Sequence, residues 1–254
     1  MKRMDIALPH SPSFKDMLKK TLCLFLTFVV LCIPVYAQGE KDIYAWSSFS
    51  KSDGVYARVD TADKVIALTF DDGPHPTLTP KILEILDKYD AKATFFVVGK
   101  MAKTYPQALK QVALKGHEIG NHTLSHIQES DGNCEKLKAE IIQTEDIIFK
   151  LTGKKTFLFR PPTGYCCASA VNMTNELGYK TVVWDIDTKD WAHRTPQQIL
   201  AEVKKYAKNG SIILFHDFIG KNSPTPRALE IVLPWLKAQG FRFVTVGEMI
   251  GMDV

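Results

Sequence analysis

Short apolar segments alternate with longer amphipathic segments from residue 63 onward, and this alternation constrains the fold more than any other feature. Strands are expected at Val65–Phe70, Thr94–Gly99, Glu118–Asn121, Phe157–Arg160, Thr181–Trp184, Ile212–Phe215 and Arg242–Val246. Helices are expected near residues 79–90, 103–115, 134–151, 169–177, 196–208 and 225–239. Runs such as VIALTF and SIILF are apolar almost throughout, which is typical of parallel strands covered on both faces. The pattern predicts an α/β fold, a distorted (β/α)7 barrel with its active site at the C-terminal ends of the strands, and a doubly wound open sheet is the alternative.

Residues 1–37 have the pattern of an export signal. Two lysines precede a charge-free apolar stretch, Thr21–Ala37, whose last residues suit signal-peptidase cleavage before Gln38. The stretch is at the short limit for a membrane-spanning helix, so an uncleaved N-terminal anchor is the alternative. We therefore expect a secreted or cell-surface protein. Its expected divisions are a signal peptide at 1–37, an N-terminal extension at 38–62 and one folded domain at 63–254.

The charge balance gives no reason to expect a nucleic-acid partner. The formal net charge is +4, from 32 basic and 28 acidic residues. Residues 1–37 hold five of the basic and two of the acidic residues, which leaves 27 against 26 in the remainder. The remainder of the chain is therefore nearly neutral, whereas nucleic-acid-binding domains are usually strongly basic. Contact with a membrane is expected only through the N-terminal segment, if that segment is not cleaved.

Ionisable residues follow five of the predicted strands at their C-terminal ends. In chain order they are Asp71-Asp72, the pair His122 and His126, Arg160, the segment Asp187–Trp191, and His216-Asp217. Because the C-terminal ends of the strands meet at one rim of a β/α barrel, these side chains are expected to form one site.

Two histidines and two adjacent acids in this set suit a metal site. The i, i+4 spacing of His122 and His126 would put both imidazoles on one face if a helical turn begins there. Two imidazoles and one carboxylate bind Zn²⁺ or a similar divalent cation and leave positions open for water and substrate. The adjacent carboxylates of Asp71 and Asp72 repel each other unless a cation offsets their charge or they face apart. We expect one divalent metal ion, with Zn²⁺ as the first choice and Co²⁺, Ni²⁺ or Mn²⁺ as alternatives.

Five ordered motifs within residues 63–250 resemble those of the polysaccharide deacetylases, carbohydrate esterase family four. The motifs are Thr69-Phe70-Asp71-Asp72-Gly73-Pro74, His122-Thr123-Leu124-Ser125-His126, Arg160-Pro161-Pro162-Thr163-Gly164, Asp187–Trp191 and Leu214-Phe215-His216. The resemblance implies that Asp71 is the catalytic base. It also implies that Asp72, His122 and His126 bind the metal, and that residues 63–254 are the catalytic domain.

The later motifs imply the remaining roles. Arg160 should orient Asp71, and His216 should act as the general acid, held in place by Asp190. The positions implied to contact substrate are Thr163 through its backbone N–H at the oxyanion, Trp191 as a wall of the groove, and Leu214 in the acetyl pocket. The sequence departs from the family at Thr163, where an aromatic residue is frequent.

Three cysteines remain outside the apolar N-terminal stretch, and their spacing matches no zinc site. We expect either that all three are thiols or that one disulfide joins Cys134 to a member of the adjacent pair Cys166-Cys167. Because Cys134 follows the second motif and the pair follows the third, we expect Cys134 to lie near one of the two. The adjacent pair is itself unexpected in the family.

The resemblance implies a metal-dependent hydrolase that removes N-acetyl groups from N-acetylglucosamine units of an extracytoplasmic polysaccharide, with peptidoglycan as the first choice. Chitin oligomers, an exopolysaccharide and O-acetyl xylan are alternative substrates. A non-haem iron oxygenase also uses two histidines and one carboxylate, but its expected all-β scaffold disagrees with the alternating pattern. An inactive carbohydrate-binding descendant is the third hypothesis, and the filled motif positions argue against it.

Overall fold

The computed structural model describes residues 50–128, 134–165, 167–220 and 222–252. The predicted signal peptide or anchor, residues 1–37, lies outside this part of the chain, as does the first half of the predicted extension. Among the described residues, none of the helices is both long and apolar enough to cross a membrane.

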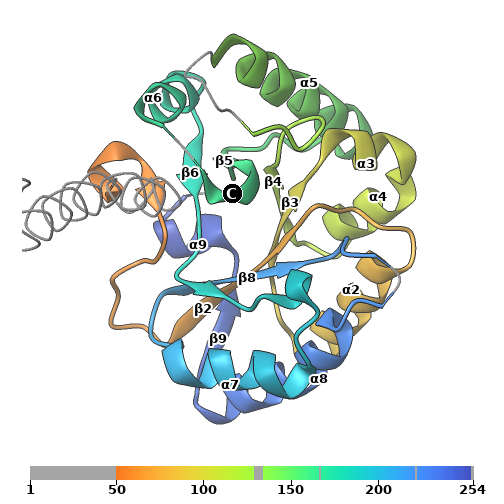
Figure 1. The fold of residues 1–254 in the computed structure, drawn as a ribbon, viewed down its shortest axis with the longest axis vertical. Coiled ribbons are helices and arrows are strands. Elements are labelled where there is room, and N and C mark those ends of the chain that lie inside the picture. The colour runs from red at the N-terminus through yellow and green to blue at the C-terminus, as the bar shows by residue number, and fades with distance from the viewer. Residues whose placement is uncertain (1–49, 129–133, 166, 221, 253–254) are drawn as a thin grey trace, which may run out of the picture. The chain divides into compact units, whose positions relative to one another are not determined.

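A curled sheet of parallel strands forms the centre of the fold (Figure 1). Its strands are β1 (Val55–Tyr56), β2 (Val65–Asp71), β3 (Thr94–Val97), β4 (Glu118–Asn121), β5 (Leu158–Phe159), β6 (Lys180–Val182), β7 (Ile186–Asp187), β8 (Ser211–His216) and β9 (Arg242–Val244). Their order is β1-β6-β5-β4-β3-β2-β8-β7, and β9 pairs with the first half of β2. Since β1 and β7 end this order, the sheet is an open half-barrel. The predicted distorted β/α barrel is confirmed.

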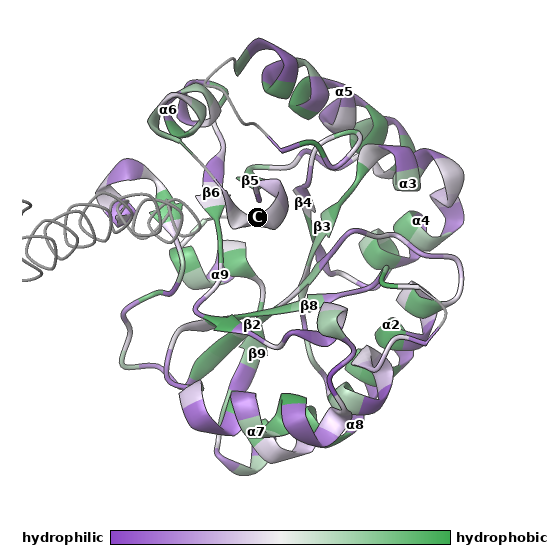
Figure 2. Cartoon of the chain, viewed as in Figure 1, coloured by the Kyte–Doolittle hydropathy of each residue, from purple (hydrophilic) through white to green (hydrophobic). Residues whose placement is uncertain are grey.

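Helices cover the outer face of the sheet, with their hydrophobic sides toward it (Figure 2). They are α2 (Leu78–Lys88), α3 (Gly99–Thr104), α4 (Pro106–Leu114), α5 (Cys134–Thr152), α6 (Ala168–Glu176), α7 (Pro196–Tyr206) and α8 (Thr225–Ala238). The short α9 (Val246–Ile250) packs instead against the inner-face cluster that includes Ala67 and Phe96. The described residues also form the short 3-10 turns η2 (Lys51–Asp53), η3 (Pro162–Gly164) and η4 (Asp190–Ala192). The last two lie on the loops that carry predicted site residues.

Several elements differ from the sequence prediction, and α9, which follows β9, was not expected at all. The helix expected at 103–115 begins earlier and is split into α3 and α4, because Pro106 lacks an N–H and Tyr105 before it leaves the helical conformation with φ −126° and ψ 57°. Strand β7 was not expected. Nor was β1, which joins the described part of the extension to the sheet by pairing Val55 with Thr181.

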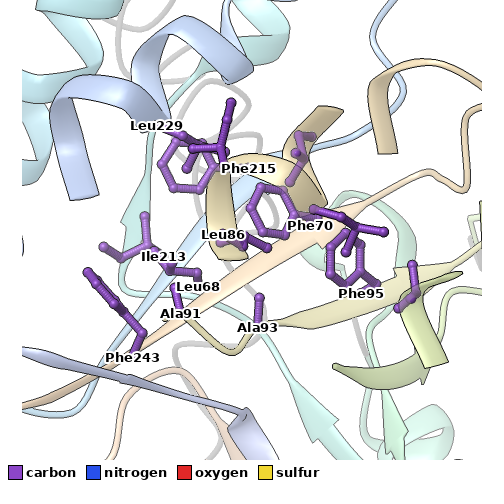
Figure 3. Close-up of a cluster of buried hydrophobic side chains, with 14 of the residues drawn as sticks. Leu68, Phe70, Leu86, Ala91, Ala93, Phe95, Ile213, Phe215, Leu229 and Phe243 are labelled. Carbon is purple, nitrogen blue, oxygen red and sulfur yellow. The ribbon is translucent and has the colours of Figure 1, made fainter. Parts of the chain in front are cut away.

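The core fixes the register of the strands that carry the site. Phe70 on β2 stacks on Phe95 of β3 and Phe215 of β8, with ring centroids 4.9 and 5.7 Å apart (Figure 3). These rings belong to the cluster between sheet and helices. Successive residues of a strand point to opposite faces, so Asp71, next to Phe70, points to the inner face of the half-barrel. The register places Asp71 directly beside His216.

Two of the three cysteines outside the N-terminal stretch lie in the described chain. Cys134 begins α5, Cys167 precedes α6, and both pack against one cluster that includes Leu137, Phe159 and Met173. Cys166 lies outside the described residues. The structure therefore brings the α5 and α6 cysteines to one region, as expected, and the bridge itself stays a prediction.

Candidate active site

The predicted site residues gather at the C-terminal ends of β2, β4, β5 and β8 and on the loop that follows β7. Parallel pairing places these ends at one rim of the sheet. Half of the ten residues are buried at the base of this rim, so the core sets their geometry: Asp71, His122, Arg160, Asp190 and Leu214.

Asp71 and Arg160 form a buried ion pair on the inner face. Arg160 Nη1 donates to Asp71 Oδ1 at 2.7 Å and to Thr69 Oγ1 at 2.8 Å. The guanidinium also donates to the carbonyl oxygens of Val182 and Val183, and it lies 4.0 Å from the ring centroid of Phe96. These four hydrogen bonds hold the guanidinium in place, so it fixes Asp71 Oδ1 and leaves Asp71 Oδ2 toward the site.

Asp72 faces the two histidines of the second motif. Its Oδ1 lies 3.5 Å from His122 Nε2 and 3.2 Å from His126 Nε2. The three ligand atoms lie within 4.8 Å of one another. Asp72 Oδ1 is buried and accepts no hydrogen bond from any residue that the structure describes. A carboxylate oxygen without a hydrogen-bond partner and two imidazole nitrogens beside it are the ligand atoms that a divalent cation needs. The three residues therefore fit the expected metal ion.

The backbone of the second motif differs from the expected helical turn. Residues 122–128 form an irregular loop in which Thr123 and His126 have positive φ angles of 67° and 58°. The loop still brings the two imidazole centroids to 5.0 Å. The two imidazoles therefore lie together as expected, but an irregular loop brings them together in place of a helical turn.

The buried His122 is oriented by a hydrogen bond on the far side of its ring. Its Nδ1 lies 2.7 Å from the carbonyl oxygen of Arg160, and a carbonyl only accepts, so Nδ1 carries the proton. In the neutral ring Nε2 is then an acceptor that faces Asp72, the arrangement usual for metal-binding histidines. Burial raises the pKa of Asp72, but the interaction with His122, whose Nε2 lies 3.5 Å away, outweighs it and lowers that pKa.

His216 and Asp190 form a second polar pair across the site. His216 Nδ1 lies 2.7 Å from Asp190 Oδ1, and the backbone N–H of His216 donates to Asp190 Oδ2 at 2.8 Å. Thr225 Oγ1 and the Trp191 N–H also donate to this fully buried carboxylate. Burial lowers the pKa of His216, but the hydrogen bond and charge of Asp190, with the charges of Asp71 and Asp72, raise it to about 9.

The three residues expected to contact substrate lie around these pairs. Thr163 is in the η3 turn with a φ of 61°, and its backbone N–H makes no hydrogen bond within the described chain. Trp191 is 52% exposed on η4, with Nε1 donating to Asp187 Oδ1 at 3.3 Å. Leu214 is buried on β8. One residue without a predicted role, Asp217, is also buried at this rim.

Three groups lie at one rim of the sheet. They are a carboxylate paired with an arginine, an imidazole paired with a carboxylate, and a set of ligand atoms for a divalent cation. Together with the curled parallel sheet, they define a hydrolase built on a β/α half-barrel.

Comparison with known proteins shows the family to which this hydrolase belongs. The polysaccharide deacetylase family model matches residues 58–182. The peptidoglycan-N-acetylglucosamine deacetylase of Bacillus cereus is 45% identical over 190 residues, which cover 74% of this chain and 89% of that protein. The crystal structure of the Bc1960 peptidoglycan N-acetylglucosamine deacetylase has a TM-score of 0.78 at 34% identity, over 83% of this chain and 97% of that one. The chain belongs to the polysaccharide deacetylase family.

A third similarity bears on the metal. A family 4 acetyl xylan esterase from Clostridium thermocellum, solved in complex with a cobalt ion, has a TM-score of 0.69 at 36% identity, over 74% of this chain and 91% of that one. Deacetylases of this family are metalloenzymes. The oxygenase hypothesis fails, because the fold is a parallel α/β half-barrel.

Proposed function

We propose that this protein is a metal-dependent N-deacetylase that hydrolyses the acetamido group of N-acetylglucosamine units in peptidoglycan. The observation that carries the proposal is the convergence of three groups at one rim. These are the open donor set Asp72, His122 and His126, the Asp71–Arg160 pair and the His216–Asp190 pair.

In this proposal Asp72, His122 and His126 hold one divalent cation, Zn²⁺ as first choice. When bound, such an ion polarises a carbonyl oxygen and lowers the pKa of water. Asp71 is the general base, and its Oδ2, which the Arg160 pair leaves toward the site, takes a proton from the attacking water. The water oxygen bonds to the acetyl carbon, and the electron pair of the carbonyl bond moves to the oxygen.

His216 completes the reaction as the general acid. Its Nδ1 is committed to Asp190, so Nε2–H is the proton that reaches the departing amine nitrogen as the carbon–nitrogen bond breaks. The products are acetate and a free amine on the sugar. The N–H of Thr163 stabilises the charged oxygen, Trp191 stacks on a sugar ring, and Leu214 packs against the acetyl methyl group.

Peptidoglycan is the favoured substrate because two similar proteins named above carry it in their names and because residues 1–37 have the pattern of an export signal. An exported enzyme meets the cell wall first. Chitin oligomers, an exopolysaccharide and O-acetyl xylan remain alternatives, the last supported by the similarity to an acetyl xylan esterase. In the exported protein we expect Gln38 to be the first residue, which N-terminal sequencing tests.

Acetate release across a panel of substrates tests the function. Purified protein loaded with Zn²⁺ is assayed on peptidoglycan, on chitin oligomers and on acetyl xylan, with His122→Ala as the inactive control. Release that is fastest from peptidoglycan supports the proposal. Faster release from chitin oligomers or acetyl xylan overturns the substrate, and no release from any of them overturns the activity.

A further inference from the structure

Asp217 is a buried carboxylate at the active-site rim that the proposed mechanism does not use. It follows His216 at the end of β8 and is 1% exposed. Its Oδ1 is buried and has no hydrogen-bond partner within the described chain. Leaving a carboxylate oxygen buried without a partner is costly, so a group of this kind needs an explanation.

The contacts of Asp217 all lead to the first motif and the helix that follows it. Its backbone N–H donates to the carbonyl oxygen of Asp71 at 3.1 Å. Its Oδ2 accepts from Thr79 Oγ1, in the first turn of α2, at 2.5 Å. The carboxylate also lies flat against Gly73, where an added Cβ would come within 2.1 Å of Oδ1 and 2.2 Å of Oδ2. Glycine at position 73 is what lets the carboxylate approach the chain so closely.

The segment held in this way carries the metal-ligand candidate Asp72. Asp72 lies between Asp71 and Gly73, both of which contact Asp217, and its own backbone has a φ of 75°. A residue other than glycine in this left-handed region is strained, so the surrounding structure has to hold it there. The β2–β8 pairing ends at Asp71 and His216, so the contacts made by Asp217 extend this hold past the end of the sheet.

The charge of Asp217 also favours a cation at the site of Asp72. Burial raises the pKa of its carboxyl to about 7, the hydrogen bond from Thr79 opposes the rise, and the charges of Asp72 and Asp71 add to it. Arg160 and the protonated His216 lie beside Asp71 and Asp72 and offset part of their negative charge. Ionised Asp217 adds a further negative charge next to this group, which would attract a divalent cation beside Asp72.

We propose that Asp217 is a positioning residue that holds Asp72 in its ligand geometry and strengthens the binding of a divalent cation at the Asp72, His122 and His126 site. The proposal rests on the metal site of the proposed function. It assigns Asp217 no contact with the substrate or with the ion. Groups that orient metal ligands from behind typically change metal affinity by about 10–100-fold when removed.

Titration of the metal-free protein with Zn²⁺, in competition with a chromogenic chelator, tests the proposal without measuring activity. Asp217→Asn keeps the size and the hydrogen-bonding capacity toward Thr79, and we expect a dissociation constant about 10-fold higher. Asp217→Ala removes the contacts as well, and we expect about 100-fold. His122→Ala removes a ligand and reports that the site itself is being measured.

Asp185→Asn is the matched control, because it changes another partly buried aspartate that contacts β8. Asp185 accepts from Ser211 Oγ and from the Ile212 N–H at the opposite end of β8. It should leave the dissociation constant unchanged even if the protein unfolds more easily. Wild-type affinity in both Asp217 variants, with affinity lost in His122→Ala, overturns the role of Asp217 alone. Equal Zn²⁺ affinity in wild type and His122→Ala overturns the metal site and the proposal together.

Discussion

Two adjacent aspartates have different partners, and their roles should separate by mutation. Asp71 contacts Arg160, whereas Asp72 faces His122 and His126. Asp71→Asn keeps the size of the side chain and an oxygen for Arg160, but an amide cannot take up the proton from water. We expect the rate of acetate release to fall roughly 10²–10⁴-fold, with Zn²⁺ affinity close to wild type.

The control for Asp71→Asn is the loss of a ligand. His122→Ala should lose both acetate release and Zn²⁺ binding, because one of three protein ligands is gone. Titration of both variants with Zn²⁺ separates the two cases. If Asp71→Asn loses the metal as readily as His122→Ala does, the roles of the two aspartates are reversed.

The His216–Asp190 pair predicts how activity depends on pH. Burial lowers the pKa of His216, and Asp190 overcomes this and raises it to about 9. A group with a raised pKa stays protonated below that value, so the general acid is available at neutral pH and is lost as the pH rises through about 9. Asp190→Asn removes the charge that raises the pKa. Its alkaline fall in kcat/KM should therefore occur at lower pH than in wild type.

Thr225→Val gives the comparison for this pH profile. It removes one hydrogen bond to Asp190 Oδ2 and leaves the charge of the carboxylate in place. Its alkaline limb should stay near that of wild type. Identical profiles for Asp190→Asn and wild type would mean that another group sets the alkaline limb.

Sequence reasoning could predict which residues meet, because the rule that parallel strands end at one rim needs no coordinates. It could not predict the conformation of the second motif, where His126 has a left-handed backbone in place of a helical turn. It also gave no role to Asp217. The contact of that carboxylate with Gly73 depends on the turn after β2, which periodicity does not encode.

At the scale of elements, length decides what the sequence can predict. Strand β2 and strand β8 are long apolar runs, and both were predicted to within one residue at each end. Strands β1 and β7 have two residues each, which is too short for a periodic signal, and they form only because a neighbouring edge of the sheet is available. The break between α3 and α4 was readable in principle from Pro106.

Because β2 pairs with three strands, its core residues should dominate stability. Leu68 lies on β2 and is fully buried among helix and strand residues. Leu68→Ala should lower the free energy of unfolding by about 2–5 kcal/mol, measured by urea denaturation. Leu114→Ala on α4 is the control: that side chain is 78% exposed, and its loss should cost no more than about 0.5 kcal/mol. A smaller loss at Leu68 than at Leu114 would contradict this account of the core.

On the scale of the whole molecule, the polar residues at the N-terminal and C-terminal ends of the strands have different roles. At the N-terminal ends of the strands, Glu118 accepts from Thr94 Oγ1 and from the N–H of Gly247, which fastens α9 to the sheet. At the C-terminal ends, buried polar groups face one another with an acceptor left open. The contacts at the N-terminal ends of the strands stabilise the fold, whereas the polar groups at the C-terminal ends form the candidate active site.

Metal binding should therefore stabilise the whole molecule as well as permit catalysis. Asp72 follows β2, the histidines follow β4, and β3 lies between these strands in the sheet, so one ion would join parts of the chain that are brought together only by folding. A ligand of the native state at 100 times its dissociation constant adds about 2.7 kcal/mol of stability. Chelator should abolish acetate release and lower the melting temperature, and added Zn²⁺ should restore both. His122→Ala should melt at the same temperature with and without Zn²⁺, whereas full activity of the wild type in excess chelator would rule out a catalytic metal.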